Sequence, residues 1–327
     1  MRVLITGGAG FIGANLTREL TERSIEVSIL DDLSTGRRTN LTGLDADFHL
    51  GTILDVDQLT TLAAGVDAIV HLAARSSVPR SINDPLASHH ANATGTLNVL
   101  EAARRVGGRH VIMASSSSVY GANAELPKRE HAATRPMSPY AASKLAAEAY
   151  ALAYGSSFGL PTLAFRFFNV FGPLQPAGHV YAAAIPAFVD AALRGKAITV
   201  HGDGTQSRDF THVSTVCRTI ASALVGRISS PDPINLAFGS RISLNEVLAL
   251  IADRVDEPLI VTNTENRAGD VPHSQADPTL LHGLFGNVVP KDFAEGLDET
   301  IEWMRGEIAN ETATIDLAGA VPSEQAA

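Results

Sequence analysis

Residues 2–13, "RVLITGGAGFIG", join an apolar strand pattern to a glycine-rich turn and then to a helical pattern. In such a turn Gly7 permits the tight bend, and Gly10 leaves room for a pyrophosphate to approach the backbone. Gly13 lets the helix pack closely on the strand. The N-terminus of the helix then faces the phosphates. The stretch predicts a dinucleotide site behind the first strand of a parallel sheet.

Apolar runs alternate with helical patterns through the rest of the first half. We predict strands at 27–31, 47–51, 68–73, 110–115 and 162–170, and helices at 11–23, 92–106 and 138–155. This alternation is typical of a parallel sheet with helices on both faces. We therefore expect an α/β fold with a doubly wound, Rossmann-type sheet.

The length of 327 residues is too great for one ordinary core, so we expect two lobes that share one site. Residues 1–170 would form the dinucleotide-binding domain, with 211–240 packing back onto it. Residues 171–210 and 241–305 would form a smaller mixed α/β substrate-binding domain. The end of the chain, 306–327, is small and polar with little periodicity, and we expect it to be disordered or weakly docked.

Composition excludes several classes of protein. The net charge is −10 with no basic block, which argues against nucleic-acid binding, and no apolar run is long enough to span a bilayer. The single cysteine, Cys217, excludes an intrachain disulfide framework and fits a reducing cytoplasm. The first residues enter a strand directly, unlike a signal peptide. We expect no metal ion in the site.

Asp31 ends the second predicted strand, about where a dinucleotide fold places its acidic residue, and Asp32 follows it. A carboxylate there accepts hydrogen bonds from the adenosine ribose and repels a 2′-phosphate, which favours NAD over NADP. Arg37 and Arg38 are the opposing signal, because arginines can receive a 2′-phosphate. We give the strand-end carboxylate more weight.

The stretch "YAASK" places Tyr140 and Lys144 four residues apart in a predicted helix, and therefore on one face. An ammonium beside a phenol stabilises the phenolate, which can then take a proton from a sugar hydroxyl. Alone, the pair would be a surface tyrosine and a solvated lysine. It gains meaning from the dinucleotide turn and from the serine run "SSSSVYG" (115–121).

Together, "TGGAGFIG", "LDDLSTG", "IVHLAA", "SSSSVYG", "YAASK", "FRFFNVFGP", "GDGTQSRDFTHV" and "RAGDVPHSQADP" resemble the extended short-chain dehydrogenase/reductases. Within them the chain is similar to the NAD-dependent nucleotide-sugar epimerases and dehydratases, above all to the UDP-glucose 4-epimerases. The resemblance runs from Met1 to about residue 305.

The resemblance implies roles for particular residues. Ser116 would hydrogen-bond the sugar 4-oxygen and relay its proton to Tyr140, the base that Lys144 assists. The NAD site would comprise the three glycines and Asp31 with Asp32, and further Phe11, Ile12, Leu72, Ala73, Ala74, Asn92, Tyr140, Lys144 and Phe168. Asn92 has a plain alternative as a hydrogen-bonded core amide.

On the substrate side, the resemblance implies that Asn169 contacts the nucleotide diphosphate and that Arg208 and Arg267 clamp it. Arginine suits this work because its planar guanidinium meets phosphate oxygens in pairs. Ser274 would occupy the position that limits the size of the sugar. A small residue there predicts that N-acetylhexosamines are accepted beside plain hexoses.

Two departures from the family pattern bear on function. Thr52 stands where many relatives carry the aspartate that contacts adenine. Dehydratases carry an Asp–Glu pair directly before "VYG", and this chain has Ser117 and Ser118 there. Two serines are no acid–base pair for the elimination of water, so 4,6-dehydration is disfavoured.

These expectations favour an NAD-dependent 4-epimerase of a UDP-hexose, acting through a transient 4-keto sugar, in a cytoplasmic homodimer paired through helices 92–106 and 138–155. A dehydratase or reductase acting on a UDP- or TDP-sugar is the alternative within enzymes. A silent NAD-binding sensor is the alternative outside them, and the presence of Ser116, Tyr140 and Lys144 argues against it.

Overall fold

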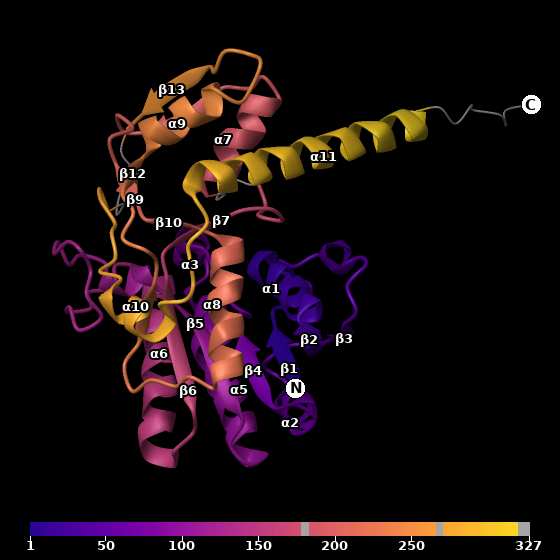
Figure 1. Cartoon of the computed structure of the whole chain (residues 1–327), viewed down its shortest axis with the longest axis vertical. Helices are drawn as coiled ribbons and strands as arrows, with labels where there is room; N and C mark the ends of the chain where they lie inside the picture. Colours follow the sequence, from indigo (N-terminus) through magenta and orange to yellow (C-terminus); the bar gives the residue numbers. More distant parts are fainter. Residues whose placement is uncertain (178–182, 266–270, 320–327) are drawn as a thin grey trace, which may run out of the picture.

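The computed structural model describes residues 1–177, 183–265 and 271–319. Its centre is a seven-stranded, fully parallel sheet in the order β11-β6-β5-β4-β1-β2-β3 (Figure 1). The strands are β1 (Arg2–Thr6), β2 (Glu26–Asp31), β3 (Asp47–Leu50), β4 (Ala68–His71), β5 (His110–Ser116), β6 (Thr162–Phe167) and β11 (Ile234–Leu236). The predicted doubly wound α/β sheet is confirmed.

Helices cover both faces of the sheet, as the alternation along β1 requires. Val3 and Ile5 belong to one apolar core and Leu4 to the other, because successive strand side chains point to opposite faces. The first face carries α1 (Phe11–Glu22) and α8 (Val213–Gly226), and the second α2 (Val56–Ala64), α5 (Gly95–Arg105) and α6 (Pro139–Phe158). Shorter helical pieces are η1 (Arg38–Leu41), α3 (Val78–Asn83), α4 (Pro85–His89), η2 (His90–Thr94) and η3 (Ser117–Tyr120).

A smaller lobe lies beyond the carboxyl edge of the sheet (Figure 1). Its apolar core joins α7 (Ala184–Leu193), β8 (Ile198–His201), α9 (Leu244–Ala252) and the first turns of α11 (Phe293–Gly319). Ser243 and Glu246 form the reciprocal capping box of α9. Three two-stranded ladders complete the lobe and its junction, pairing β7 (Asn169–Phe171) with β10 (Phe210–His212), β9 (Ser207–Arg208) with β12 (Ile242–Ser243), and β8 with β13 (Val261–Thr264).

The structure differs from the expected organisation in three places. The predicted strand 162–170 is interrupted at Phe168 and continues as β7, which pairs with β10 outside the main sheet. α10 (Thr279–Phe285) lies within the segment assigned to the substrate lobe, yet Leu281 and Phe285 pack into the core of the main sheet beside β11. α11 continues as a helix through Gly319, into the segment expected to be disordered, and residues 320–327 lie outside the description.

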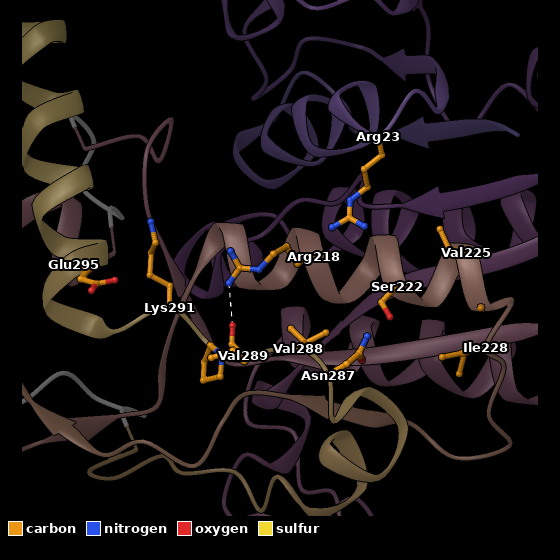
Figure 2. Close-up of a pocket in the computed structure, with 12 residues that line it drawn as sticks. Arg23, Arg218, Ser222, Val225, Ile228, Asn287, Val288, Val289, Lys291 and Glu295 are labelled. Carbon is orange, nitrogen blue, oxygen red and sulfur yellow. Dashed lines mark hydrogen bonds between the residues drawn. The ribbon is translucent and has the colours of Figure 1, made fainter.

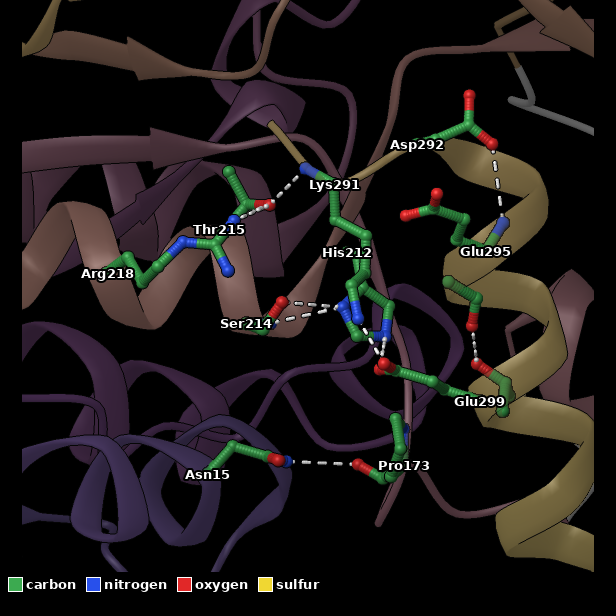
Figure 3. A network of polar contacts seen from close by, with 12 residues as sticks. Asn15, Pro173, His212, Ser214, Thr215, Arg218, Lys291, Asp292, Glu295 and Glu299 are labelled. Carbon is green, nitrogen blue, oxygen red and sulfur yellow. Dashed lines mark hydrogen bonds and ion pairs between the residues drawn. The ribbon is translucent and has the colours of Figure 1, made fainter. Parts of the chain in front are cut away.

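The junction between the lobes is a polar cluster at the start of α8 and α11 (Figure 3). His212 is buried and caps α8 by accepting from Ser214 N–H, while its Nε2 lies 3.6 Å from Glu299 of α11. Glu299 also pairs with Lys291, whose backbone N–H donates to Thr215 of α8. On the other side Asn15 donates from α1 to the Pro173 carbonyl. These contacts hold the substrate-binding lobe against α1 and α8.

Candidate active site

The glycine turn has the geometry that the sequence predicts. Gly7 has a φ of +75°, and a Cβ there would lie 2.6 Å from Ala73 N, so the turn is pressed against the loop after β4. A Cβ on Gly13 would lie 2.3 Å from the Gly7 carbonyl oxygen, which enforces glycine by close packing. Gly10 supplies no side-chain cap to α1, so the N–H groups of its first turn, at Phe11 and Ile12, stay available to an anion.

Asp31 closes the turn from the neighbouring strand. Its carboxylate accepts from Ala9 N–H at 2.9 Å and from Leu33 N–H at 2.8 Å, and burial raises its pKa despite these two bonds. Asp32 is exposed and accepts from Ser34 N–H. The guanidinium of Arg38, which was considered above as a partner for a 2′-phosphate, stacks 4.6 Å from the Phe48 ring centroid. Thr52 accepts from Leu54 N–H at 3.3 Å within its own turn. The glycine turn and this carboxylate together fit a dinucleotide.

Ser116 and Tyr140 meet at the carboxyl edge of β5. A side-chain hydrogen bond from Ser116 lowers the pKa of Tyr140, while burial of the phenol, the larger effect, raises it above the ordinary value. Ser118 donates to Ser116 Oγ at 2.9 Å, which continues the hydroxyl chain away from the phenol. The arrangement can pass a proton between a bound hydroxyl and Tyr140.

Lys144 reaches the same strand one helical turn later. It is buried and donates from Nζ to the Ala114 carbonyl at 2.8 Å, and burial lowers its pKa to about 8. We predicted that its charge stabilises the phenolate directly. In the described residues, the group that lowers the pKa of Tyr140 is Ser116. The ammonium of Lys144 is held by a backbone carbonyl of β5, and the effect of its charge on the phenolate stays a prediction.

Asn92 is a buried amide with several hydrogen bonds, and its contact with NAD stays a prediction. It lies in the π-helical turn η2, accepts from Arg75 N–H at 2.8 Å and donates to Ser143 Oγ at 2.9 Å. Ser143 in turn donates to the Tyr140 carbonyl. The amide therefore joins the loop after β4, which holds Leu72, Ala73 and Ala74, to the helix that carries Tyr140.

His71 was not among the predicted site residues. This residue connects the hydrogen bonds of Asn92, through Thr96, to Thr6 directly before the glycine turn. Its Nδ1 lies 2.7 Å from Thr6 Oγ1, and its Nε2 lies 2.9 Å from Thr96 Oγ1. Thr96 donates to the Asn92 carbonyl, so its oxygen is free to accept from a neutral ring protonated at Nε2. Burial, and next the charge of Lys144, lowers the pKa of His71 to about 3 and keeps it neutral.

The predicted substrate residues lie farther out. Asn169 and Arg208 line one pocket of about 580 Å³, which also has apolar walls from α7. Arg208 donates to the Ser207 and Pro272 carbonyls. Ser274 N–H also donates to the Ser207 carbonyl, which brings the backbone of Ser274 to the segment that carries Arg208. Phe168 is buried with its ring 6.4 Å from Tyr120. Arg267 lies outside the described residues.

Asp209, directly after Arg208, was also missed. It is fully buried and accepts from Gly239 N–H, Ser240 Oγ and Ala276 N–H at 2.9–3.0 Å. Burial raises its pKa to about 6. The carboxylate joins the segment of Asp209 to residues 239–240 and to Ala276. An aspartate between an arginine and a phenylalanine was the signal that the sequence offered.

A second pocket, of about 750 Å³, lies along α8 and is lined by no predicted site residue (Figure 2). Arg23, Arg218 and Lys291 surround it, but Arg23 pairs with Glu19 and Lys291 with Glu299. Arg218 donates to the Val289 carbonyl. The described residues hold no group of three or more metal-ligating side chains and no helix able to cross a bilayer.

The chain is similar in sequence to known proteins over most of its length. Residues 3–237 match the model of the NAD dependent epimerase/dehydratase family. A UDP-glucose 4-epimerase from Mycolicibacterium smegmatis is 36% identical over 312 residues, covering 93% of this chain and 99% of the relative. The chain belongs to the NAD-dependent epimerase/dehydratase family of the extended short-chain dehydrogenase/reductases.

Solved structures agree with this assignment. A UDP-N-acetylglucosamine 4-epimerase from Methanobrevibacter ruminantium M1, in complex with UDP-N-acetylmuramic acid, is 34% identical with a TM-score of 0.89, over 94% of this chain and 98% of the other. A dTDP-glucose 4,6-dehydratase from Streptomyces venezuelae with NAD bound is 32% identical with a TM-score of 0.87, over 94% and 98%. The cofactor is NAD, and the protein is an enzyme acting on nucleotide sugars.

Proposed function

We propose that the protein interconverts UDP-hexoses at carbon 4. The observation that carries the proposal is the placement of Ser116 at the carboxyl edge of β5, where it acts to lower the pKa of Tyr140, with serines at 117 and 118. The pair provides a base for the 4-hydroxyl, while no acid–base pair for elimination of the 6-hydroxyl stands before Val119. The alternatives within the family are a 4,6-dehydratase and a reductase.

In the proposed reaction, the glycine turn with Phe11 and Ile12 holds the pyrophosphate, and Asp31 holds the adenosine ribose. Bound NAD supplies a site that takes up a hydride and later returns it. Tyr140 receives the proton of the 4-hydroxyl through Ser116, and Lys144, fixed on the Ala114 carbonyl, keeps a positive charge nearby. Asn169, Arg208 and Arg267 retain the diphosphate while the 4-keto sugar turns over. Return of the proton from Tyr140 completes the inversion, with no net oxidation.

The sugar range is proposed from Ser274, which is small and lies beside Ser207 and Arg208. A small side chain leaves room for an N-acetyl group, so UDP-N-acetylhexosamines should be substrates together with UDP-glucose and UDP-galactose. One of the similar structures above is an epimerase of UDP-N-acetylglucosamine, which supports this proposal.

The test is incubation of the protein with UDP-glucose, UDP-galactose, UDP-N-acetylglucosamine, dTDP-glucose and GDP-mannose, with products identified by NMR. Inverted carbon 4 without change in NADH absorbance is the expected result. A stable keto product would show a dehydratase, and net NADH turnover a reductase. Inversion of the plain hexoses alone would refute the role of Ser274.

We also propose a homodimer through α5 and α6. Ala142 and Ala149 are exposed along α6, and such small residues permit close helix approach. Phe158, at the end of α6, and Leu86, on the adjoining α4, are 57% and 71% exposed. Exposed large apolar side chains of this kind are typical of an interface.

A further inference from the structure

A buried ion pair lies directly beneath the catalytic residues. Tyr140, Lys144 and Glu148 follow one another at four-residue intervals, so they share one face of α6. Glu148 pairs there with Arg166 of β6, and the two side chains are only 3% and 4% exposed. The proposed reaction uses neither residue.

The pair has dense hydrogen bonding from several elements. Arg166 donates to both carboxylate oxygens of Glu148, at 2.6 and 2.9 Å, in the two-point geometry that arginine favours. Ser115, the neighbour of Ser116, donates to Glu148 at 2.6 Å. Arg166 also donates to the Glu130 carbonyl, in the loop before α6, and lies 4.7 Å from the Tyr120 ring centroid.

Stability alone is a poor reason for this arrangement. Desolvation of two charges offsets most of their attraction, and apolar replacements of buried pairs are often equally stable. Hydrogen bonds differ from apolar contacts in their directionality. Arg166 of β6 bonds Glu148 at two points, and Ser115 of β5 bonds it at a third. These bonds fix the rotation of α6 about its axis and its position along the sheet, which apolar packing would define less closely.

We propose that Glu148 and Arg166 are positioning residues that set the rotation of α6, so that Tyr140 meets Ser116 and Lys144 meets the Ala114 carbonyl. Ser115 connects the pair to the strand end that carries Ser116. Rotation of α6 moves the phenol and the ammonium together, so both catalytic contacts depend on this one anchor. The inference rests on the proposed function, because epimerisation is one of its readouts.

The first test is Glu148→Gln, which keeps the shape but places an amide N–H₂ against the guanidinium. A displacement of about 1 Å can cost about 100-fold in rate. We therefore expect kcat to fall about 10- to 100-fold, with KM for the UDP-sugar within about 2-fold of the native value. The matched control is Asp190→Asn, which weakens the partly exposed pair of Asp190 on α7 with Arg194 just after it and should leave kcat unchanged.

The second readout needs no sugar. The titration of Tyr140 is measured in the NAD-loaded protein as the difference in phenolate absorbance against Tyr140→Phe. Loss of the Ser116 bond raises the pKa of Tyr140, whereas removal of a nearby negative charge alone would lower it. A raised pKa in Glu148→Gln supports positioning, and an unchanged or lowered pKa overturns it. If the native protein inverts no sugar, the proposed function fails, and this titration still decides the inference.

The double variant Glu148→Met/Arg166→Met separates positioning from stability, because it leaves no unpaired charge. We expect it to fold, by circular dichroism, and to retain NAD while kcat stays low and the pKa of Tyr140 stays raised. Native kcat in the folded double variant would overturn the proposal. If the double variant does not fold, Glu148→Gln decides by its two readouts.

Discussion

At the scale of single residues, the proposed catalysis depends on the phenol oxygen of Tyr140. Tyr140→Phe keeps the ring and removes the oxygen that Ser116 contacts. We expect kcat to fall by about 10²–10⁴-fold, the usual contribution of a positioned acid–base group. NAD should remain bound, because the glycine turn is unchanged. The measurement is the initial rate of sugar inversion together with the cofactor content of the purified protein.

The control for this change is Tyr150→Phe on the same helix, where the phenol is 42% exposed. It should keep native kcat. Retention of full activity by Tyr140→Phe would show that another group accepts the proton, and the reaction assigned to this site would be wrong.

At the scale of elements, the junction of α8 and α11 depends on a neutral His212. Burial lowers its pKa to about 4, against the opposing charge of Glu299, while the unfolded chain has the ordinary value of 6.5. Between these values the unfolded state binds a proton that the folded state does not. The free energy of unfolding therefore falls as the pH drops from 6.5 to 4, by about 3 kcal/mol for this one residue.

The variant His212→Asn tests this prediction, because asparagine is also a good N-cap but does not titrate. We expect the decline in unfolding free energy between pH 6.5 and 4 to be smaller by up to about 3 kcal/mol than in the native protein, measured by urea denaturation. The exposed His131→Asn serves as control. Parallel pH dependence in all three proteins would contradict a buried neutral His212.

For the whole molecule, Ala149 offers a test of the proposed dimer. The residue is exposed in the single chain, so Ala149→Arg should leave the fold intact but hold the paired helices apart. We expect light scattering to give half the native mass. Ala64→Arg, at an exposed position on α2, should keep the native mass. A native protein that is already monomeric would end the proposal.

Local patterns were sufficient to predict the sheet, its main helices and the glycine turn. Gly7, Gly10 and Gly13 follow one strand and open one helix, and the helical spacing of Tyr140 and Lys144 places both toward β5. The capping box of α9 likewise joins two residues that are only three apart, Ser243 and Glu246. Each of these features depends on residues within about one or two turns of one another, and the backbone geometry they require is set locally.

Long-range contacts could not be predicted in this way. Lys144 bonds to Ala114, Glu148 to Arg166, His71 to Thr6, and Asp209 to loops 30 and 67 residues away. A buried polar group takes whichever partner the packed chain brings within hydrogen-bond distance, and a sequence pattern does not specify that partner. The weak periodicity after residue 305 also did not predict that α11 continues through Gly319. The sequence by itself therefore determined the sheet, its glycine turn and the family of the protein, and it predicted the chemistry at the edge of the sheet. Tertiary packing determined which buried groups surround that edge.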